Sequence, residues 1–486
     1  MPSYLVESLI TAITCAAAFG FAGLAYRRQR FGWALLGILI GGLALRLFAG
    51  ADQYLHTWDE KFHALVAKNL LEHPLRPTLI DNPVLPYDHR AWYSNHIWLH
   101  KPPLPLWLMA GSIGLFGATD WAVRLPSLLL SLLAIFVTFR MGKALFDTRV
   151  GLLAAFLHAV NGKLIELAAG RDSSDHVETC HVVMFQLAMW WVVRNWQQRD
   201  HRSALLAGVF TGLAFLSKWT PAAFIPLIWF LGALWQQQPF RELLRHGLLL
   251  GVFALIVGVP WVGYIAVYYP EESRSLWEGV LRAQHDIVET HGGPWYFYLD
   301  RMRILFGELV YLPLLAGLLV LYRAPHRKGL FVLALWIAVP LLAFSAASTK
   351  RDTYLLVTAP AFFLLTAWAI RLLLRFRWRQ VRGRWVYTVL AALFLLLPLR
   401  YGVERTKLFV ARERRPGWVD DIGAYRRQIT ASPEQAVIFG LEHNIEMMYY
   451  TGITAYSVTP AAEVLAQLKH SGYRVYLLQG NTLKEY

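Results

Sequence analysis

The chain has 486 residues, of which 56% are hydrophobic and 14% aromatic, whereas only 16% are charged. Soluble domains carry roughly a quarter charged residues, so the deficit argues against an ordinary soluble protein and indicates lipid as part of the solvent. The formal net charge of +15 does not indicate a nucleic-acid-binding protein, because the basic residues are spread over separate short segments between apolar runs.

Apolar segments close to the ~20 residues that span a bilayer recur along the chain. About twelve transmembrane helices are predicted, near residues 4–26, 31–50, 124–144, 150–168, 177–195, 203–217, 219–236, 245–268, 304–322, 328–347, 353–373 and 384–401. In the first of them the cationic residues follow the apolar run, which indicates a retained helix and not a signal peptide. Cys15 and Cys180 both fall in predicted spans, which argues against a disulfide framework.

Basic residues occupy alternate loops, which the positive-inside rule assigns to the cytoplasm. The opposite, outer side then receives residues 51–123, 169–176, 269–303 and 348–352 and the tail. The sequence therefore predicts an all-α polytopic membrane domain over residues 1–401, with long outer loops at 51–123 and 269–303. It also predicts a small outer, periplasmic α/β domain over residues 402–486.

The first outer loop and the tail carry local structure of their own. Residues 59–71 have the pattern of a short amphipathic helix, and residues 103–117 that of a helix lying in the membrane interface. In the tail, short strands are predicted at 436–439, 455–458 and 474–478, with helices near 443–450 and 460–469 between them. No internal repeat is visible, which weakens the case for a transporter built on inverted repeats.

Two adjacent acids open the first outer loop. Thr57-x-x-Glu60 fits a helix capping box, which gives Glu60 an ordinary structural explanation. Asp59 would lie in the first turn, where the helix dipole favours an anion, but a cap needs only one of the two acids. A carboxylate here could orient or deprotonate a hydroxyl or amine that attacks a sugar carbon.

Cations on the outer side indicate an anionic ligand. Lys101-Pro102-Pro103 can be a rigid helix start with a snorkelling lysine, or a frame that holds a cation against a phosphate. Lys350 and Arg351 run against the positive-inside trend, and the hydroxyl of Tyr354 follows them as a further donor. A phosphate with about two charges would match these groups.

Further polar residues lie in the outer loops. Asp172 and Asp175 can each be a helix cap, or can pair with Lys101 or hold an acceptor, and Asp175 is favoured because it would open the next span. His100 and His291 could bind a divalent cation, although no local ligand spacing supports this, and isolated histidines more often only form hydrogen bonds.

Several short motifs occur in a fixed order along the chain. They are Trp58-Asp59-Glu60, His100-Lys101-Pro102-Pro103-Leu104, Arg124-Leu125-Pro126-Ser127, Ser217-Lys218, His291-x-x-Pro294-Trp295-Tyr296-x-Tyr298 and Lys350-Arg351-x-x-Tyr354-Leu355. This set, spread over nearly the whole chain, resembles the GT-C glycosyltransferases that use polyprenyl-phosphate sugars. That group contains the bacterial aminoarabinose transferases of lipid A and the protein O-mannosyltransferases.

The resemblance implies transfer of a sugar on the periplasmic face of the bacterial inner membrane, with inversion at the anomeric carbon. The donor would be a polyprenyl-phosphate sugar, the acceptor an envelope glycolipid or polysaccharide, and no cofactor is expected, with a divalent cation as an option. By motif, Asp59 would be the catalytic carboxylate, and Lys101, Lys350, Arg351 and Tyr354 would hold the departing phosphate. Asp175, with Asp172 and Glu60, would support the acceptor side.

Two other functions remain open at this point. A transporter or flippase for a lipid-linked saccharide would be expected to carry ionisable residues in the middle of its spans, whereas the informative charges here cluster in outer loops and at span ends. A bacterial protein O-mannosyltransferase would share the donor and differ in the acceptor.

Overall fold

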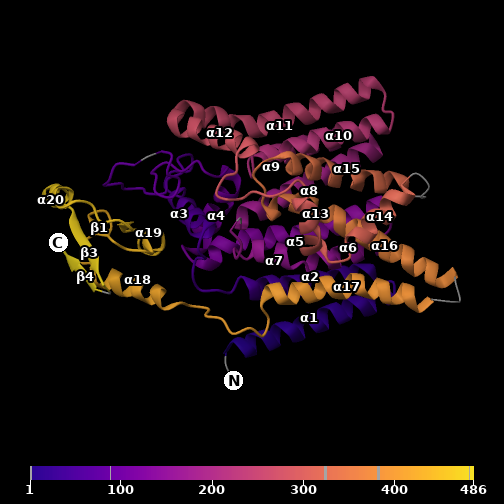
Figure 1. Cartoon of the computed structure of the whole chain (residues 1–486), viewed down its shortest axis with the longest axis horizontal. Coiled ribbons are helices and arrows are strands. Elements are labelled where there is room, and N and C mark those ends of the chain that lie inside the picture. Colours follow the sequence, from indigo (N-terminus) through magenta and orange to yellow (C-terminus); the bar gives the residue numbers. More distant parts are fainter. Residues whose placement is uncertain (1–2, 88, 174, 322–325, 380–383, 481) are drawn as a thin grey trace. The chain divides into compact units, whose positions relative to one another are not determined.

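The computed structural model describes residues 3–87, 89–173, 175–321, 326–379, 384–480 and 482–486, which form twenty α-helices, two 3-10 helices and one four-stranded sheet (Figure 1). By Cα proximity the chain divides into two compact units. Unit 1 comprises Met1–Ala49, Ser127–Tyr264 and Trp277–Ala411, and unit 2 comprises Gly50–Pro126, Ile265–Leu276 and Arg412–Tyr486. Residue 174 of the predicted outer segment 169–176 and residue 322, the last of the span predicted at 304–322, lie outside the described residues.

All the regular secondary structure in the described part of unit 1 is helical. Its helices are α1 (Ser3–Arg27), α2 (Phe31–Ala49), α5 (Asp120–Leu145), α6 (Thr148–Ala159), α7 (Gly162–Ala168), α8 (Asp175–Gln198), α9 (His201–Phe215), η1 (Thr220–Ala223), α10 (Phe224–Trp235), α11 (Phe240–Tyr268), α12 (Pro270–His285), α13 (Phe297–Phe306), α14 (Tyr311–Val320), α15 (Arg327–Ala346), η2 (Asp352–Thr358), α16 (Ala359–Arg379) and α17 (Arg384–Thr406). The first residues of α5 and the junction of α11 and α12 belong to unit 2. Glycines let neighbouring helices approach closely: a Cβ atom on Gly142 of α5 would lie 2.5 Å from Cα of Gly151 in α6.

Among the described residues, seven helices are long and apolar enough to cross a bilayer, or nine if two bent pairs each count as one span. The pairs are α6–α7, bent by 59°, and α13–α14, bent by 107°. The predicted number of about twelve is therefore not confirmed, although every predicted span coincides with helical structure. α9 and α10 are too short to qualify, and α8 is long enough but interrupted by polar side chains such as Glu178, His181 and Gln186.

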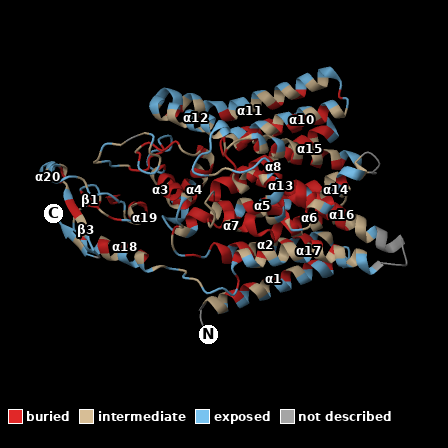
Figure 2. Ribbon diagram, in the orientation of Figure 1, coloured by how far each residue is buried: buried red, intermediate tan, exposed pale blue. Residues whose placement is uncertain are grey.

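The spans differ in how far they are buried, as Figure 2 shows. In the η2–α16 segment 89% of the most apolar stretch is buried, against 28% in α1, 22% in α11 and 17% in α17. The exposed faces of α1, α11 and α17 carry large apolar side chains such as Ile13, Leu255 and Leu396. Apolar surface of this extent needs a nonaqueous neighbour, which in a chain of this composition is lipid. The protein is a multi-pass membrane protein.

Unit 2 combines the first long loop with the tail. It holds α3 (Asp59–Asn69), α4 (Pro103–Phe116), α18 (Gly417–Gln428), β1 (Ala436–Phe439), α19 (Asn444–Thr451), β2 (Thr454–Tyr456), α20 (Ala462–His470), β3 (Arg474–Gln479) and β4 (Thr482–Glu485). The sheet order is β2-β1-β3-β4, with β1 parallel to β2 and β3, and β4 antiparallel to β3. The predicted β-α-β-α-β succession and the helices starting at residues 59 and 103 are confirmed.

One hydrophobic core runs through unit 2. Leu65 of α3 and Leu106 of α4 belong to the same buried cluster as Ile438 of β1 and Met447 of α19. The first long loop and the tail were predicted to lie in different domains, divided after residue 401. In the structure α17 continues to Thr406, and residues 412–486 share their core with residues 50–126. The amphipathic faces of α3 and α19 explain this, because each buries its apolar side chains against the other.

Candidate functional site

Asp59 is the first residue of α3, where the carboxylate benefits from the helix dipole. The preceding residue, Trp58, has a φ of 76° and its side chain forms no cap hydrogen bond. A positive φ is rare for a bulky residue, and such outliers concentrate at functional sites. The backbone at Trp58 thus departs from ordinary geometry immediately before the acid that the sequence analysis assigned to catalysis.

Lys101 forms an ion pair with Asp59, with 2.9 Å between Nζ and Oδ2. The two side chains are 19% and 12% exposed, so the pair is shielded but not sealed from solvent. Pro102 is the N-cap of α4, with φ −65° and ψ 158°, and Pro103 is its first residue. Proline is favoured at this position because its fixed φ suits a helix start and its missing N–H would be unsatisfied anyway. The two prolines therefore fix the backbone that presents Lys101.

Aromatic rings and histidines adjoin this ion pair. His63, one turn after Asp59, is fully buried and packs edge-to-face on Trp98 at 5.6 Å between ring centroids. His100 stacks on Trp92 at 4.7 Å with an interplanar angle of 11°. Rigid rings of this kind hold the residues beside them in place at little cost in conformational entropy.

The charges around Asp59 determine its protonation. Burial by itself would raise the pKa of the Asp59 carboxyl, but the charge of Lys101, that of His63 and the hydrogen bond from Lys101 outweigh it. The net effect holds the pKa of Asp59 well below its usual range, so the carboxylate is ionised at any physiological pH. A carboxylate in this state stabilises positive charge or orients a donor group, and it is a weak proton acceptor while Lys101 stays in place.

The capping box predicted for Thr57 and Glu60 is wrong, because Trp58 is the N-cap of α3. Glu60 accepts the backbone N–H of His56 at 2.6 Å and forms a two-point ion pair with Arg124, with Nε–Oε1 at 2.8 Å and Nη2–Oε2 at 3.0 Å. Both side chains are 0% exposed. From the sequence, Arg124 was recognised only as part of a motif. The structure identifies it as the partner of Glu60.

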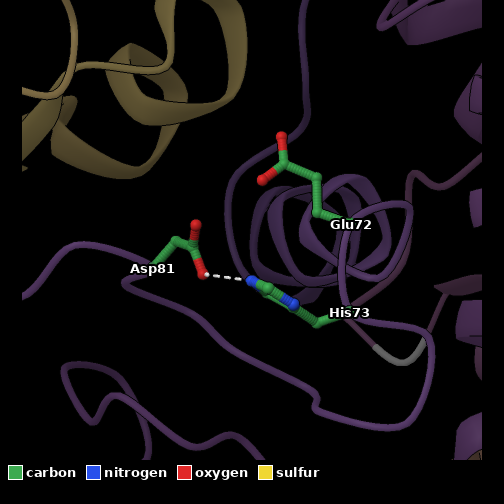
Figure 3. A group of neighbouring side chains, drawn as sticks. All are labelled: Glu72, His73 and Asp81. Carbon is green, nitrogen blue, oxygen red and sulfur yellow. Dashed lines mark ion pairs between the residues drawn. The ribbon is translucent and has the colours of Figure 1, made fainter.

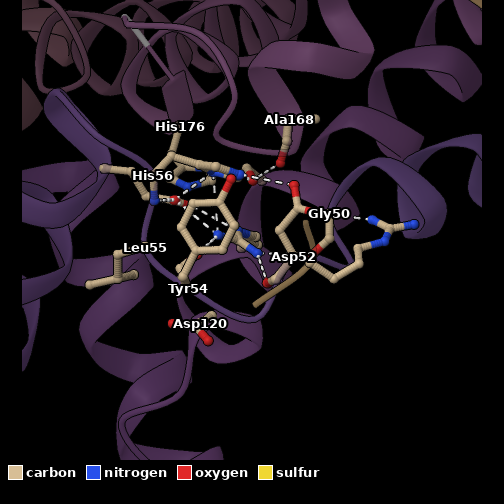
Figure 4. A network of polar contacts seen from close by, with 12 residues as sticks. Gly50, Asp52, Tyr54, Leu55, His56, Asp120, Ala168 and His176 are labelled. Carbon is tan, nitrogen blue, oxygen red and sulfur yellow. Dashed lines mark hydrogen bonds and ion pairs between the residues drawn. The ribbon is translucent and has the colours of Figure 1, made fainter. Parts of the chain in front are cut away.

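Arg124 also binds the backbone that leads into α3. Its guanidinium donates to the carbonyl oxygens of Gly50 at 3.0 Å and Tyr54 at 2.5 Å, and to that of Asp52 (Figure 4). The carboxylate of Asp52 accepts hydrogen bonds from Arg414 at 2.9 Å and from His56 Nε2 at 3.0 Å. This network fixes the segment between residues 50 and 60 and thereby the start of α3.

Within the network, burial would lower the pKa of His56, but Glu60 and Asp52 raise it to about 9 from its ordinary value of 6.5. Because the pKa of His56 is higher in the folded state, its contribution to stability is complete below pH 6.5 and disappears as the pH rises through about 9. We expect the free energy of unfolding to fall over this window by at most about 3 kcal/mol. The melting temperature of the detergent-purified protein should fall with it.

The matched variants are His56→Gln and His470→Gln, the second in the exposed part of α20. His56→Gln should melt at a lower temperature and lose the slope between pH 6.5 and 9, whereas His470→Gln should keep it. An unchanged slope in His56→Gln would show that another group titrates.

In unit 1, the loops around residues 172 and 352 meet at a buried lysine. Lys163 of α7 binds Asp172 with 2.5 Å between Nζ and Oδ2, and Asp352 with 3.3 Å. Arg351 donates from Nη2 to Oγ of Ser173 at 2.7 Å. The predicted site residues Asp172 and Arg351 are therefore brought onto adjoining loops, held together by Lys163.

Lys350 is buried, and its Nζ donates to the carbonyl oxygen of Ala347 at 2.5 Å. Its backbone N–H donates to the carbonyl oxygen of His291 at 2.7 Å. Next to it, Thr349 receives the backbone N–H of Val288 at 3.1 Å and donates to the carbonyl oxygen of Asp286 at 2.7 Å. These bonds tie the loop at residues 286–291 to the segment that carries Lys350 and Arg351.

The ring of Tyr354 lies under Lys218, with Nζ 4.2 Å from the ring centroid, and Lys218 also pairs with Glu178. Asp175 is fully buried at the start of α8 with a φ of 34°, and its Oδ1 accepts the N–H of Val177 at 3.3 Å. The helix-cap role that the sequence left open for Asp175 is thus present. A role toward an acceptor stays a prediction.

His100 and His291 are the two histidines predicted as metal ligands. His100 stacks on Trp92, and the described contact of His291 is through its carbonyl oxygen. Among the described residues, no group of three or more potential ligand side chains includes either of them. Metal binding by His100 and His291 stays a prediction.

Sequence reasoning assigned no role to three of the charged residues that organise these clusters, although Arg124 and Lys218 belong to quoted motifs. Lys163 lies inside the apolar segment predicted as one span at 150–168, and Lys218 lies between the spans predicted at 203–217 and 219–236. Ionisable residues at such places are rare and commonly functional, so this signal could have found both. Arg124 gave no such signal, because it stands at the start of a span, where arginine is common.

Residues 100–264 match the model of the dolichyl-phosphate-mannose-protein mannosyltransferase family. The chain is 27% identical over 387 residues to undecaprenyl phosphate-alpha-4-amino-4-deoxy-L-arabinose arabinosyl transferase 1 of Pseudomonas fluorescens (strain Pf0-1), which covers 77% of this chain and 64% of that protein. It is 29% identical over 325 residues to the corresponding transferase of Pseudomonas aeruginosa (strain UCBPP-PA14), covering 64% and 58%. The chain thus spans less than two thirds of the length of these relatives.

Two solved structures share the arrangement of helices. ArnT from Cupriavidus metallidurans bound to undecaprenyl phosphate superposes with a TM-score of 0.66 at 16% identity, over 92% of this chain and 93% of that one. The oligosaccharyltransferase of Archaeoglobus fulgidus superposes with a TM-score of 0.58 at 14% identity, over 91% and 69%. The chain has the GT-C fold of membrane glycosyltransferases. Within that fold it is similar, in sequence and in structure, to the bacterial aminoarabinose transferases.

Proposed function

We propose that the protein is an inverting glycosyltransferase that moves a sugar from a polyprenyl-phosphate donor to an acceptor of the bacterial envelope. The observation that carries the proposal is the ion pair between Asp59 and Lys101, presented by the first turns of α3 and α4 in a chain with the GT-C fold. An acid beside a cation provides the two groups that such a transfer needs, one for the attacking nucleophile and one for the departing phosphate.

A phosphate leaving group carries its own negative charge, so its departure requires cations more than a proton donor. Lys101 is the cation next to Asp59 in unit 2, and Lys350 and Arg351 are the cations of the outer loop in unit 1. Tyr354, beneath Lys218, adds a hydroxyl donor in unit 1. The assignment of Lys101, and of Lys350, Arg351 and Tyr354, to the donor phosphate is a prediction from the sequence motifs.

The ion pair gives donor binding a second role. While Lys101 lies 2.9 Å from Asp59, the low pKa of Asp59 makes it a poor base. A donor phosphate that attracts Lys101 removes the charge that lowers this pKa, which rises toward the range in which a carboxylate accepts a proton. The acceptor hydroxyl or amine would then give its proton to Asp59 as it attacks the anomeric carbon, and polyprenyl phosphate would leave from the opposite face.

The names of the relatives identify a donor, undecaprenyl phosphate-linked aminoarabinose, and no acceptor. For the acceptor we propose an envelope glycolipid of the lipid A type, as the resemblance to the aminoarabinose transferases implies, with a polysaccharide as the nearest alternative. Asp175 and Asp172 would support the acceptor side, with Glu60 holding the start of α3. The basic loops support a location in the inner membrane, in contact with its lipids, with these residues facing the periplasm. No nucleic acid takes part.

A protein acceptor is a second candidate, because residues 100–264 match the protein mannosyltransferase family. The donor would then be a polyprenyl-phosphate mannose and the acceptor a serine or threonine hydroxyl. The two candidates differ in their substrates and not in the residues proposed for the chemistry, so one panel of donors and acceptors separates them.

The test uses the full chain in nanodiscs with a panel of undecaprenyl-phosphate sugars, and measures the release of undecaprenyl phosphate with lipid A or with a serine- and threonine-rich peptide. Release that needs one sugar and one acceptor is the expected result. In Lys101→Ala the KM for that donor should rise by about tenfold to a hundredfold, since a hydrogen bond to a charged group contributes about 1.5–3 kcal/mol.

Lys61→Ala is the matched control, because Lys61 is also an ion-paired lysine of unit 2, bound to Glu446 at 3.1 Å. Its donor KM should stay within a few-fold of wild type. Transfer of the intact donor across proteoliposomes without release of phosphate would contradict the transferase and favour a flippase.

A further inference from the structure

A second polar group lies at the other end of α3 from Asp59. Glu72 and His73 follow the last turn of the helix, and Asp81 comes from the loop that folds back beside it. One ligand atom from each of the three side chains lies within 4.8 Å of the other two, and Nε2 of His73 is 3.8 Å from Oδ1 of Asp81. In Figure 3 the side chains of His73 and Asp81 point toward one another.

Hydrogen bonds and buried side chains fix the backbone around these residues in the absence of a metal. Asn69, near the end of α3, donates from its amide to the carbonyl oxygens of Thr78 at 3.0 Å and Leu79 at 3.4 Å. The indole of Trp107 donates to the carbonyl oxygen of Pro74 at 2.9 Å, directly after His73. Leu79 and Ile80 are buried, which anchors the residues before Asp81 in the core of unit 2.

We propose that Glu72, His73 and Asp81 bind one divalent metal ion of the Zn²⁺ class. One imidazole nitrogen and two carboxylate oxygens form a ligand set that Zn²⁺ accepts, with water completing the tetrahedron. With bonds of about 2.0–2.2 Å, the ligand atoms of a tetrahedral site lie about 3.4 Å apart. The His73–Asp81 distance of 3.8 Å is already close to that value.

The three ligand atoms must move closer together to bind one ion, and this movement requires only changes in side-chain conformation. The side chain of His73 is 44% exposed and that of Asp81 29%, and Glu72 is exposed as well, so rotation about side-chain bonds suffices to close the set. Exposure also leaves the open position that water would fill. The metal would neutralise two carboxylates that otherwise repel each other.

The site would connect two parts of unit 2 that carry the proposed chemistry. Asp59 begins α3, and the loop that starts near Thr78 leads to Lys101. A metal bridging the end of α3 and Asp81 would restrain that loop against the helix, as structural metal sites do. The inference concerns stability and metal content, and it does not depend on the proposed transfer.

The experiment uses the full chain in detergent, stripped with EDTA and then titrated with Zn²⁺ alone. Metal content after desalting is measured by mass spectrometry, and the melting temperature is measured with and without Zn²⁺. We expect one Zn²⁺ per chain and a higher melting temperature in wild type. Both should be lost in His73→Gln and in Asp81→Asn, while elution volume shows that these variants are folded.

Two matched variants identify the site. His470→Ala removes an exposed histidine elsewhere in unit 2, and His100→Ala removes the histidine predicted from sequence as a ligand. Both should keep one Zn²⁺ per chain. Absence of bound Zn²⁺ in wild type, retention of Zn²⁺ in His73→Gln, or its loss in His100→Ala would overturn the proposal.

Discussion

Asp59→Asn is expected to lower the turnover number for sugar transfer by about 10²–10⁴-fold, the range that a positioned general base contributes. Asparagine has nearly the same shape but accepts no proton from the attacking group. The variant should bind the polyprenyl-phosphate donor at least as tightly as wild type, because Lys101 then no longer faces a carboxylate 2.9 Å away. Single-turnover kinetics with labelled donor, together with equilibrium binding of the donor, separate the two effects.

The control is Asp420→Asn, which removes an exposed aspartate that pairs with Arg415 at 2.8 Å in the same unit. Turnover in this variant should stay near wild type. Near-normal turnover of Asp59→Asn would exclude Asp59 as the catalytic carboxylate even with the fold unchanged. A loss of donor binding equal to the loss of turnover would instead make Asp59 part of the donor site.

Glu60→Gln should have the largest effect on stability. The substitution leaves the guanidinium of Arg124 buried, with both side chains 0% exposed in the wild type, and removal of one partner from a buried pair costs about 3–5 kcal/mol. The two hydrogen bonds from Arg124, at 2.8 and 3.0 Å, and the bond from the backbone N–H of His56 lose their charged acceptor. Thermal unfolding in detergent, followed by intrinsic fluorescence, measures the change.

Arg124→Met and the double variant Glu60→Gln/Arg124→Met complete a mutant cycle. If the cost comes from an uncompensated buried charge, the double variant should lose less unfolding free energy than the sum of the losses in Arg124→Met and Glu60→Gln. Asp420→Asn serves again as the exposed control, with an expected change below about 1 kcal/mol. Equal melting temperatures for Glu60→Gln and Asp420→Asn would show that the buried pair does not hold the start of α3.

Much of the fold could be predicted because it depends on local composition and periodicity. The starts of α3 and α4 were predicted to the residue, and the succession of strands in the tail was found from short apolar runs between turns. β4 was missed, because its sequence, Thr482–Glu485, is polar, and it pairs only as an edge strand beside β3. The order of the sequence motifs also indicated the GT-C fold, which the structural comparison confirms.

The sequence by itself determined a membrane protein and the acid at the start of α3, because hydropathy and the helix dipole depend on residues that are neighbours in the chain. That the loops with the polar motifs face the outer side stays a prediction. The tertiary structure alone decided which charges meet. Glu60 finds Arg124 across 64 residues, and Lys163 finds Asp352 across a longer stretch, at a break between α6 and α7 that hydropathy treats as one span. A buried charge requires a partner, and which residue supplies it depends on how distant segments pack, which no local pattern records.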